Sequence, residues 1–132
     1  YDHPVTSLDI TPTILEQVGI KREDLDGINL LPYLRGNKEE PPHEFLCWRW
    51  ITQAAIRKDK WKFLQCEDRK YLFNLDEDLS EKKNLIHEFP LLSNDLEKKL
   101  SVWCQGLKPP GLKNGELPEI WVEYFDYHLG KE

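Results

Sequence analysis

Residues 54–75 read AAIRKDKWKFLQCEDRKYLFNL, and this stretch decides the fold. It contains three short apolar runs, separated by polar breaks at Lys58–Asp59 and Asp68–Arg69. The run at residues 60–64 alternates, so its two aromatic residues share one face and its two lysines share the other. Strands so closely spaced must pair antiparallel, because parallel neighbours need a long crossover. The stretch therefore predicts three antiparallel strands.

The segments on either side extend this sheet and cover it. Residues 44–51 are rich in aromatic and branched side chains, which predicts a further strand. Between residues 88 and 107, apolar residues recur at steps of four, four, three and four and make one stripe along a helix: Leu92, Leu96, Leu100, Trp103 and Leu107. We therefore predict the α+β class, with a small four-stranded antiparallel sheet packed by a C-terminal helix.

A short helix is expected nearer the N-terminus, over residues 7–18. Its apolar side chains fall on one helical face. Ser7 or Thr11 can serve as the N-cap, and Gly19 is a natural C-terminal stop. The sequence leaves the choice between the two caps open.

Proline and charge mark the internal boundary. Residues 38–42 are polar and end in two prolines, so they are the best candidate for a linker. We therefore divide the chain into residues 1–37, residues 38–107 and an aromatic tail at residues 108–132. The packing partner of this tail stays open.

The overall composition excludes several classes of function. The chain has 132 residues, with 18 Lys and Arg against 24 Asp and Glu, and a net charge of −6. An acidic balance argues against nucleic acid and anionic membranes as default partners, since both require a basic surface. No apolar stretch approaches the roughly 20 residues that span a bilayer. The sequence contains no Met and starts at Tyr1, so we expect a fragment of a longer product.

No self-contained catalytic or metal site is predicted. Three cysteines, at 47, 66 and 104, leave at least one thiol unpaired, and their spacing does not identify a bridge. His43 and Cys47 lie four residues apart, about 13 Å on an extended chain, which is too far for a nucleophile and its base. The four histidines have no metal-ligand spacing. The acidic turn at residues 76–81 lacks the glycine and distal glutamate of an EF-hand.

One short motif suggests binding. In Trp48-Arg49-Trp50, strand alternation sends the two indoles to one face and the guanidinium to the other. One interpretation is two core aromatic residues beside an exposed or ion-paired arginine. The other is a sheet edge that contacts an anionic or sugar-like ligand, by charge-assisted hydrogen bonds from the arginine and by stacking on the indoles.

The order of several motifs resembles the sulfatase family. The N-terminal part of the resemblance is carried by Pro4–Val5, Ser7–Ile10, Pro12–Leu15, Gly19, Leu25–Gly27 and Leu30–Gly36. The later part is carried by Phe45–Leu46, Trp48–Arg49, Ala55–Arg57, Lys60–Lys62, Tyr71–Leu75, Asp78, Glu81 and Asn84–Leu85. Together these motifs cover residues 4–104, in the order that the family has.

This resemblance implies the fold and the whole protein's chemistry. Residues 1–37 are expected to be the end of a large α/β sulfatase domain, with its last helix and the connecting segment. Residues 38–107 are expected to be the small C-terminal subdomain. Members of the family hydrolyse sulfate esters with calcium and a formylglycine, which forms within a Cys/Ser-x-Pro-x-Arg motif. That motif does not occur in this sequence, so no catalytic or metal residue is carried over.

The expected function is therefore that of a C-terminal fragment of an arylsulfatase-like enzyme of the alkaline phosphatase superfamily. The chain alone should be inactive, because calcium and formylglycine are expected in the missing upstream portion. It would give structural support and one wall of the substrate pocket, for which Arg49 and Trp50 are the candidates. Expected partners are the missing N-terminal catalytic domain and, for the whole enzyme, a sulfated small molecule or glycan.

Two alternatives stay open. The chain can also belong to a related phosphate or phosphonate ester hydrolase, or it can be a non-catalytic binding module. The resemblance implies an extracellular, periplasmic or lysosomal location.

Overall fold

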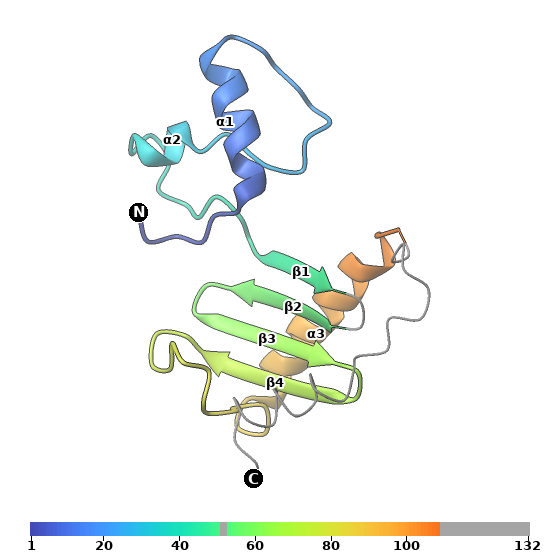
Figure 1. Ribbon diagram of the computed structural model, residues 1–132. Coiled ribbons are helices and arrows are strands. Elements are labelled where there is room, and N and C mark those ends of the chain that lie inside the picture. Colours follow the sequence, from blue (N-terminus) through green and yellow to red (C-terminus); the bar gives the residue numbers. More distant parts are fainter. Residues whose placement is uncertain (51–52, 109–132) are drawn as a thin grey trace. The chain divides into compact units, whose positions relative to one another are not determined.

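The computed structural model describes residues 1–50 and 53–108, and these form two units. The first unit, Tyr1–Leu46, is helical with long loops, and the second, which starts at Cys47, contains the sheet. Figure 1 shows the helices of the first unit, α1 (Ile10–Gln17) and α2 (Leu31–Leu34). In the described part of the chain, no helix combines the length and the apolar character needed to cross a membrane.

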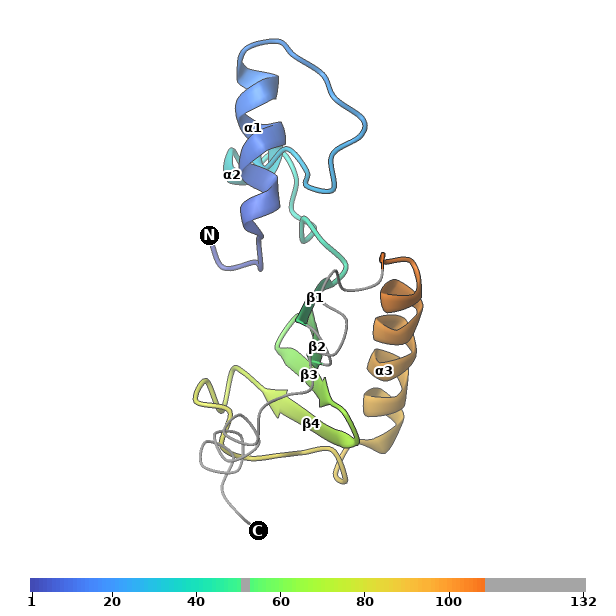
Figure 2. The same ribbon diagram turned by 45° about the vertical axis from the view of Figure 1, so that its right-hand side comes forward.

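The second unit is the predicted sheet and helix. Its strands are β1 (Leu46–Trp50), β2 (Gln53–Lys58), β3 (Trp61–Cys66) and β4 (Arg69–Asn74). They lie in the sheet in this order. Helix α3 (Pro90–Gln105) lies against one face of the sheet, as Figure 2 shows with the strands nearly end-on. The predicted α+β class, with a four-stranded antiparallel sheet and a C-terminal helix, is confirmed.

Two-residue turns join the central strands. Lys58 pairs with Trp61 across the first turn, in which Asp59 takes a positive φ of 51°. The second turn has Glu67 at a φ of 53°, and Arg69 is already paired in β4. Positive φ is what the tight turns favoured in hairpins require. The predicted break at Asp68–Arg69 was therefore one residue too late.

The core lies between the sheet and α3. Ile56, Phe63 and Leu72 are partners across β2, β3 and β4, and all three are fully buried. From the helix, Leu96 and Leu100 are buried as well. The apolar stripe predicted for residues 88–107 therefore faces the sheet, because burying it removes apolar surface from water.

The outer edge of β4 is closed by a loop. The Asn84 side chain accepts a hydrogen bond from Leu72 N–H (3.0 Å) and donates one to the Lys70 carbonyl (3.3 Å). The Leu85 N–H donates to the Leu72 carbonyl (2.8 Å). These bonds replace part of a fifth strand and satisfy backbone groups that an edge strand would otherwise leave unpaired.

In the first unit, a 3-10 turn at Ser7–Asp9 precedes α1. Thr6 caps the turn and Asp9 caps the helix, so the prediction of Ser7 or Thr11 was wrong. The reason is that the Asp9 carboxylate turns back to accept from the Thr6 N–H, at 2.9 Å. Gly19 does end the helix, with a φ of 75° that glycine adopts without strain.

A long loop returns to the start of α1. The Thr13 hydroxyl donates to the Asp9 carbonyl (2.6 Å) and accepts from the Leu30 N–H (2.9 Å). Gly27 lies so close that a Cβ there would overlap the carbonyl group of Leu8. The loop can approach this closely only because residue 27 has no side chain.

Candidate functional site

Arg49 and Trp50 lie at the end of β1, an edge strand of the sheet. The Arg49 Nη2 donates to the Lys108 carbonyl at 2.6 Å, just beyond the end of α3. Trp50 is 52% exposed. Successive residues of a strand face opposite sides, so the structure places these two candidates next to each other but does not point them the same way.

A hollow of about 410 Å³ lies near them, on the sheet face away from α3. It is lined by Trp48, Ala55, Arg57, Lys62, Leu75, Leu79 and Glu81. Lys62 Nζ donates to both oxygens of Glu81, at 2.7 and 2.8 Å, and this ion pair anchors the loop after β4 to the sheet. Arg57 donates from Nε to the Asp59 carbonyl at 3.2 Å.

The chemistry of this hollow suits a polar ligand that has an apolar face. Trp48 is 45% exposed and offers an indole beside aliphatic side chains. Lys62 and Glu81 offer hydrogen-bonding groups of both signs. Sequence reasoning identified the tryptophan but missed the ion pair. The alternation of Lys62 with aromatic neighbours placed the lysine on this face, but nothing local predicted its partner 19 residues away.

The most organised polar group in the first unit is the Asp9 carboxylate. It is fully buried and accepts three hydrogen bonds of 2.9 Å, from the Thr6 N–H, the Ile28 N–H and His43 Nε2. Burial alone would raise the pKa of this carboxyl, but these donors outweigh burial and hold the pKa below its usual value. A carboxylate this well satisfied holds the fold together and is not available as a general base.

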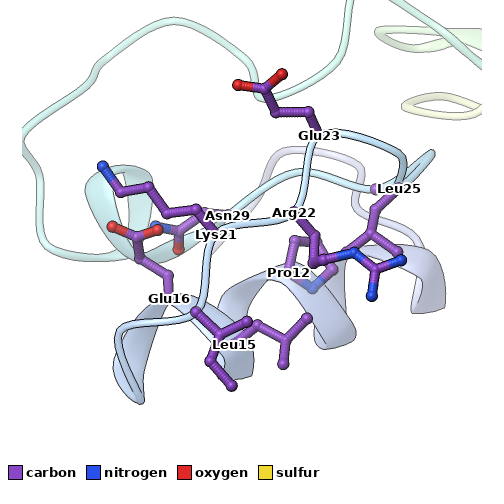
Figure 3. Close-up of a pocket in the computed structure, with 10 residues that line it drawn as sticks. Pro12, Leu15, Glu16, Lys21, Arg22, Glu23, Leu25 and Asn29 are labelled. Carbon is purple, nitrogen blue, oxygen red and sulfur yellow. The ribbon is translucent and has the colours of Figure 1, made fainter.

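A second cavity, of about 300 Å³, lies between α1 and the following loop (Figure 3). Pro12 and Leu15 line it from the helix, while Lys21 and Arg22 line it from the loop. The Arg22 guanidinium is held by both carboxylate oxygens of Asp24. Glu16 and Glu23 also line the cavity, so carboxylates stand beside the two cations and the cavity does not resemble an anion site.

The cysteines are not activated nucleophiles. All three thiols are free. Burial raises the pKa of Cys47 to about 12, with a smaller contribution from the charge of Cys104. Burial also raises the pKa of Cys66. A thiol needs a lowered pKa to attack at neutral pH, so neither residue has catalytic character.

His43 contacts Asp9 through Nε2, and the sequence did not predict this contact.

In the described part of the chain, side chains that bind metals do not cluster. Among residues 1–50 and 53–108, no three His, Cys, Asp or Glu side chains could hold a metal ion together. These residues therefore do not fit the calcium ion that the resemblance implies for the whole enzyme, and we assign none of them to it.

The comparisons with known sequences find sulfatases. The chain is 33% identical to choline-sulfatase of Rhizobium meliloti (strain 1021), over 62% of the chain and 18% of that protein. It is 28% identical to arylsulfatase K of Danio rerio, over 74% of the chain and 21% of that protein. It therefore spans about a fifth of the length of these curated relatives. No protein-family profile matches it.

Solved structures share the fold, and among them is BT1596, a 2-O GAG sulfatase, which matches 82% of this chain and 28% of its own at 25% identity, with a TM-score of 0.60. Ps i-CgsB, crystallised in complex with k-i-k-neocarrahexaose, matches 95% of this chain and 29% of its own, with a TM-score of 0.70 and 30% identity. A phosphonate monoester hydrolase of Agrobacterium radiobacter matches 81% of this chain and 26% of its own, with a TM-score of 0.61. At 23% identity, the hydrolase shows only a shared fold.

The fold, the order of the motifs and these relatives agree. The match extends over most of this chain but over only part of each relative, as expected for a C-terminal portion. The chain therefore resembles a C-terminal portion of sulfatases in both sequence and fold.

Proposed function

We propose that this chain is the C-terminal portion of an enzyme that hydrolyses sulfate esters. The observation that carries the proposal is the match to choline-sulfatase of Rhizobium meliloti (strain 1021), at 33% identity over 62% of the chain. Because the chain spans only 18% of that protein, we assign the catalytic machinery to the rest of the enzyme. That upstream portion would supply the formylglycine and the calcium.

The contribution that we propose for this chain is support and one wall of the substrate pocket. Arg49 has five N–H donors, of which the contact with the Lys108 carbonyl uses one, so a positioned guanidinium can also donate to a sulfate oxygen. Trp48 and Trp50 share the other face of β1 and offer indoles to a sugar ring. Ps i-CgsB was crystallised with an oligosaccharide. A sulfated glycan is therefore the substrate class that we favour over a small aryl ester.

The first experiment assays the native protein that carries this chain. It would be offered an aryl sulfate, the matching aryl phosphate and the matching phosphonate monoester, each at several concentrations. We expect kcat/KM to be highest for the sulfate ester. Higher kcat/KM for the phosphonate or phosphate ester would favour the related hydrolase, and hydrolysis of none of the three would favour a binding module.

The second experiment tests the proposed wall in the same native protein. Arg49→Ala and Trp50→Ala should each raise KM for a sulfated oligosaccharide by roughly tenfold, with a smaller effect on an aryl sulfate that lacks the sugar. Arg49→Lys should recover only part of the loss, because an ammonium cannot make the bidentate contacts of a guanidinium. Leu91→Ala is the matched control, since Leu91 is 85% exposed on α3.

The outcomes of the two experiments are separable. If both wall variants keep the wild-type KM while sulfate hydrolysis persists, the wall is wrong and the enzyme class stands. If KM rises equally for the aryl sulfate and the oligosaccharide, Arg49 and Trp50 do not contact the sugar.

A further inference from the structure

Two of the three cysteines lie on the same side of the sheet. Trp48 lines the hollow on the face away from α3, so its strand neighbour Cys47 faces the opposite side, toward the helix. Cys66 lies three residues after the core residue Phe63 on the same strand. Residues an odd number of positions apart face opposite sides of a sheet, so Cys66 lies on the face that carries the hollow. The sheet therefore separates Cys66 from Cys47.

The third cysteine approaches Cys47 from the helix. Cys104 follows the buried residues Leu96 and Leu100 at steps of four, so it continues the stripe that faces the sheet. Both Cys47 and Cys104 are half-buried. The Cys104 side chain is also near enough that its negative charge, when it is a thiolate, raises the pKa of Cys47 beyond the effect of burial.

One hydrogen bond joins β1 to the segment just beyond α3. Arg49 Nη2 donates to the Lys108 carbonyl at 2.6 Å, three residues after the last residue of α3. From Arg49 to Cys47 is two steps back along the strand, about 6.6 Å. Cys104 lies four residues before Lys108, in the last turn of α3. The contact between Arg49 and Lys108 therefore brings the end of β1, which carries Cys47, to the C-terminal end of α3, which carries Cys104.

We propose that Cys47 and Cys104 are a disulfide-forming pair, which ties the edge strand β1 to the last turn of α3 when a disulfide oxidant is present. The bond would close a loop that contains β2, β3, β4 and most of α3. Its stabilising effect would come mainly from restricting the unfolded chain. The proposal is independent of the reaction that the whole protein catalyses.

The chemistry is two successive thiol–disulfide exchanges with a small disulfide such as oxidised glutathione. The Cys104 thiolate attacks one sulfur of the oxidant, and one glutathione thiol leaves. Cys47 then loses its proton to solvent and attacks the Cys104 sulfur, and the second glutathione thiol leaves. Two protein thiols are oxidised by two electrons, and the oxidant is reduced to two thiols. The raised pKa of Cys47 makes the second step the slow one.

The test maps the thiols of the native protein by mass spectrometry. The protein would be incubated at pH 8 with oxidised glutathione, denatured, alkylated without reduction and digested with trypsin. We expect residues 39–49 to appear joined to residues 100–113, at two hydrogens less than the sum of the two peptides. Dithiothreitol should release the pair. Cys66, in the peptide of residues 63–69, should be fully alkylated.

Variants sharpen the test. Cys66→Ser should leave the joined peptides unchanged, whereas Cys47→Ser and Cys104→Ser should each abolish them. The proposal is overturned if Cys47 and Cys104 stay alkylatable, if either pairs with Cys66 instead, or if both carry glutathione without joining each other. The wild-type map decides the matter even if one variant does not fold.

Discussion

Asp9 keeps its negative charge inside the protein because three donors meet it there. Its hydrogen bonds join the start of the first helix, the loop at Ile28 and the segment that carries His43. An isolated buried carboxylate would be costly, and would become protonated instead. Here the donors are backbone groups and an imidazole, and a neutral replacement would leave some of them unsatisfied.

Asp9→Asn should therefore weaken the first unit, and the loss should depend on pH. An amide has one acceptor oxygen for three donors, so we expect about 1–3 kcal/mol of destabilisation at pH 7. The pKa of Asp9 is lower in the folded state than its ordinary 3.8, so the stability from its charge is present above about pH 4 and is lost as pH falls through the folded pKa. The difference between variant and wild type should shrink below pH 4. Hydrogen exchange over residues 4–30 at several pH values measures it.

Asp24→Asn is the control for this prediction. Arg22 hydrogen-bonds to Asp24 and lowers the pKa of that carboxyl to about 2, but both side chains are more than half exposed. Exposed pairs contribute little to stability. We expect no measurable change at pH 7, and an equal loss in the two variants would contradict the special role of Asp9.

Gly27 gives a second prediction at this scale. Gly27→Ala places a methyl group into the backbone of Leu8, which cannot rotate away as a side chain could. We expect a cost of about 2 kcal/mol or more, from overpacking. Gly106→Ala is the matched control, because Gly106 has a helical φ of −75° and an ordinary Cβ environment. Exchange over residues 4–30 should accelerate in the first variant, and wild-type rates there would refute the clash.

At the scale of elements, every predicted strand and helix of the second unit was found, with bounds that moved by one or two residues. Strand β3 was expected at residues 60–64 and runs over Trp61–Cys66. Helix α3 was expected at residues 88–107 and runs over Pro90–Gln105. The period of the apolar residues predicts which element forms, while the ends depend on turns and caps that are less regular. The boundary predicted after residue 37 stays a prediction, and the two contact-defined units meet at Leu46 and Cys47.

The closed edge of β4 can be tested by Asn84→Ala. The variant leaves the fully buried Leu72 without the acceptor for its N–H, which should cost about 1–2 kcal/mol. The Leu72 amide should then exchange about tenfold faster with solvent. Asn94→Ala, on an exposed position of α3, should leave that amide unchanged. Equal protection in both variants would mean that the loop closes the edge through the Leu85 backbone alone.

At the scale of the whole molecule, the chain exposes an apolar helix face. The resemblance implies that this helix packs within a larger domain, and Ile10, Ile14 and Val18 of the same face are all more than half exposed. Exposed contiguous apolar surface promotes association. A chain of residues 1–132 should therefore self-associate in sedimentation, and Ile14→Glu should shift it toward monomer. Gln17→Glu adds the same charge without removing apolar surface and should have little effect. A wild-type chain that sediments as a monomer would contradict the prediction.

The candidate site was only partly predictable from the sequence. Strand alternation correctly separated Arg49 from its two tryptophan neighbours, because side-chain direction in a strand is a local property. The role of Arg49 and Trp50 in substrate binding stays a prediction. The ion pair between Lys62 and Glu81, which builds the hollow, depends on how the loop after β4 folds back, and no local pattern encodes that path.

The sequence by itself determined the sheet, its covering helix and the resemblance to sulfatases, because the apolar period, the turn residues and the order of the motifs are all local properties of the chain. Only the tertiary structure decided which distant polar groups meet. Asp9 and His43 are 34 residues apart, and Arg49 and Lys108 are 59 apart. Such contacts form where packing brings the segments together, and a buried carboxylate or a held guanidinium is stabilised by all its partners at once. The chemistry of this chain therefore lies in its folded contacts, although its architecture can be read from the order of its residues.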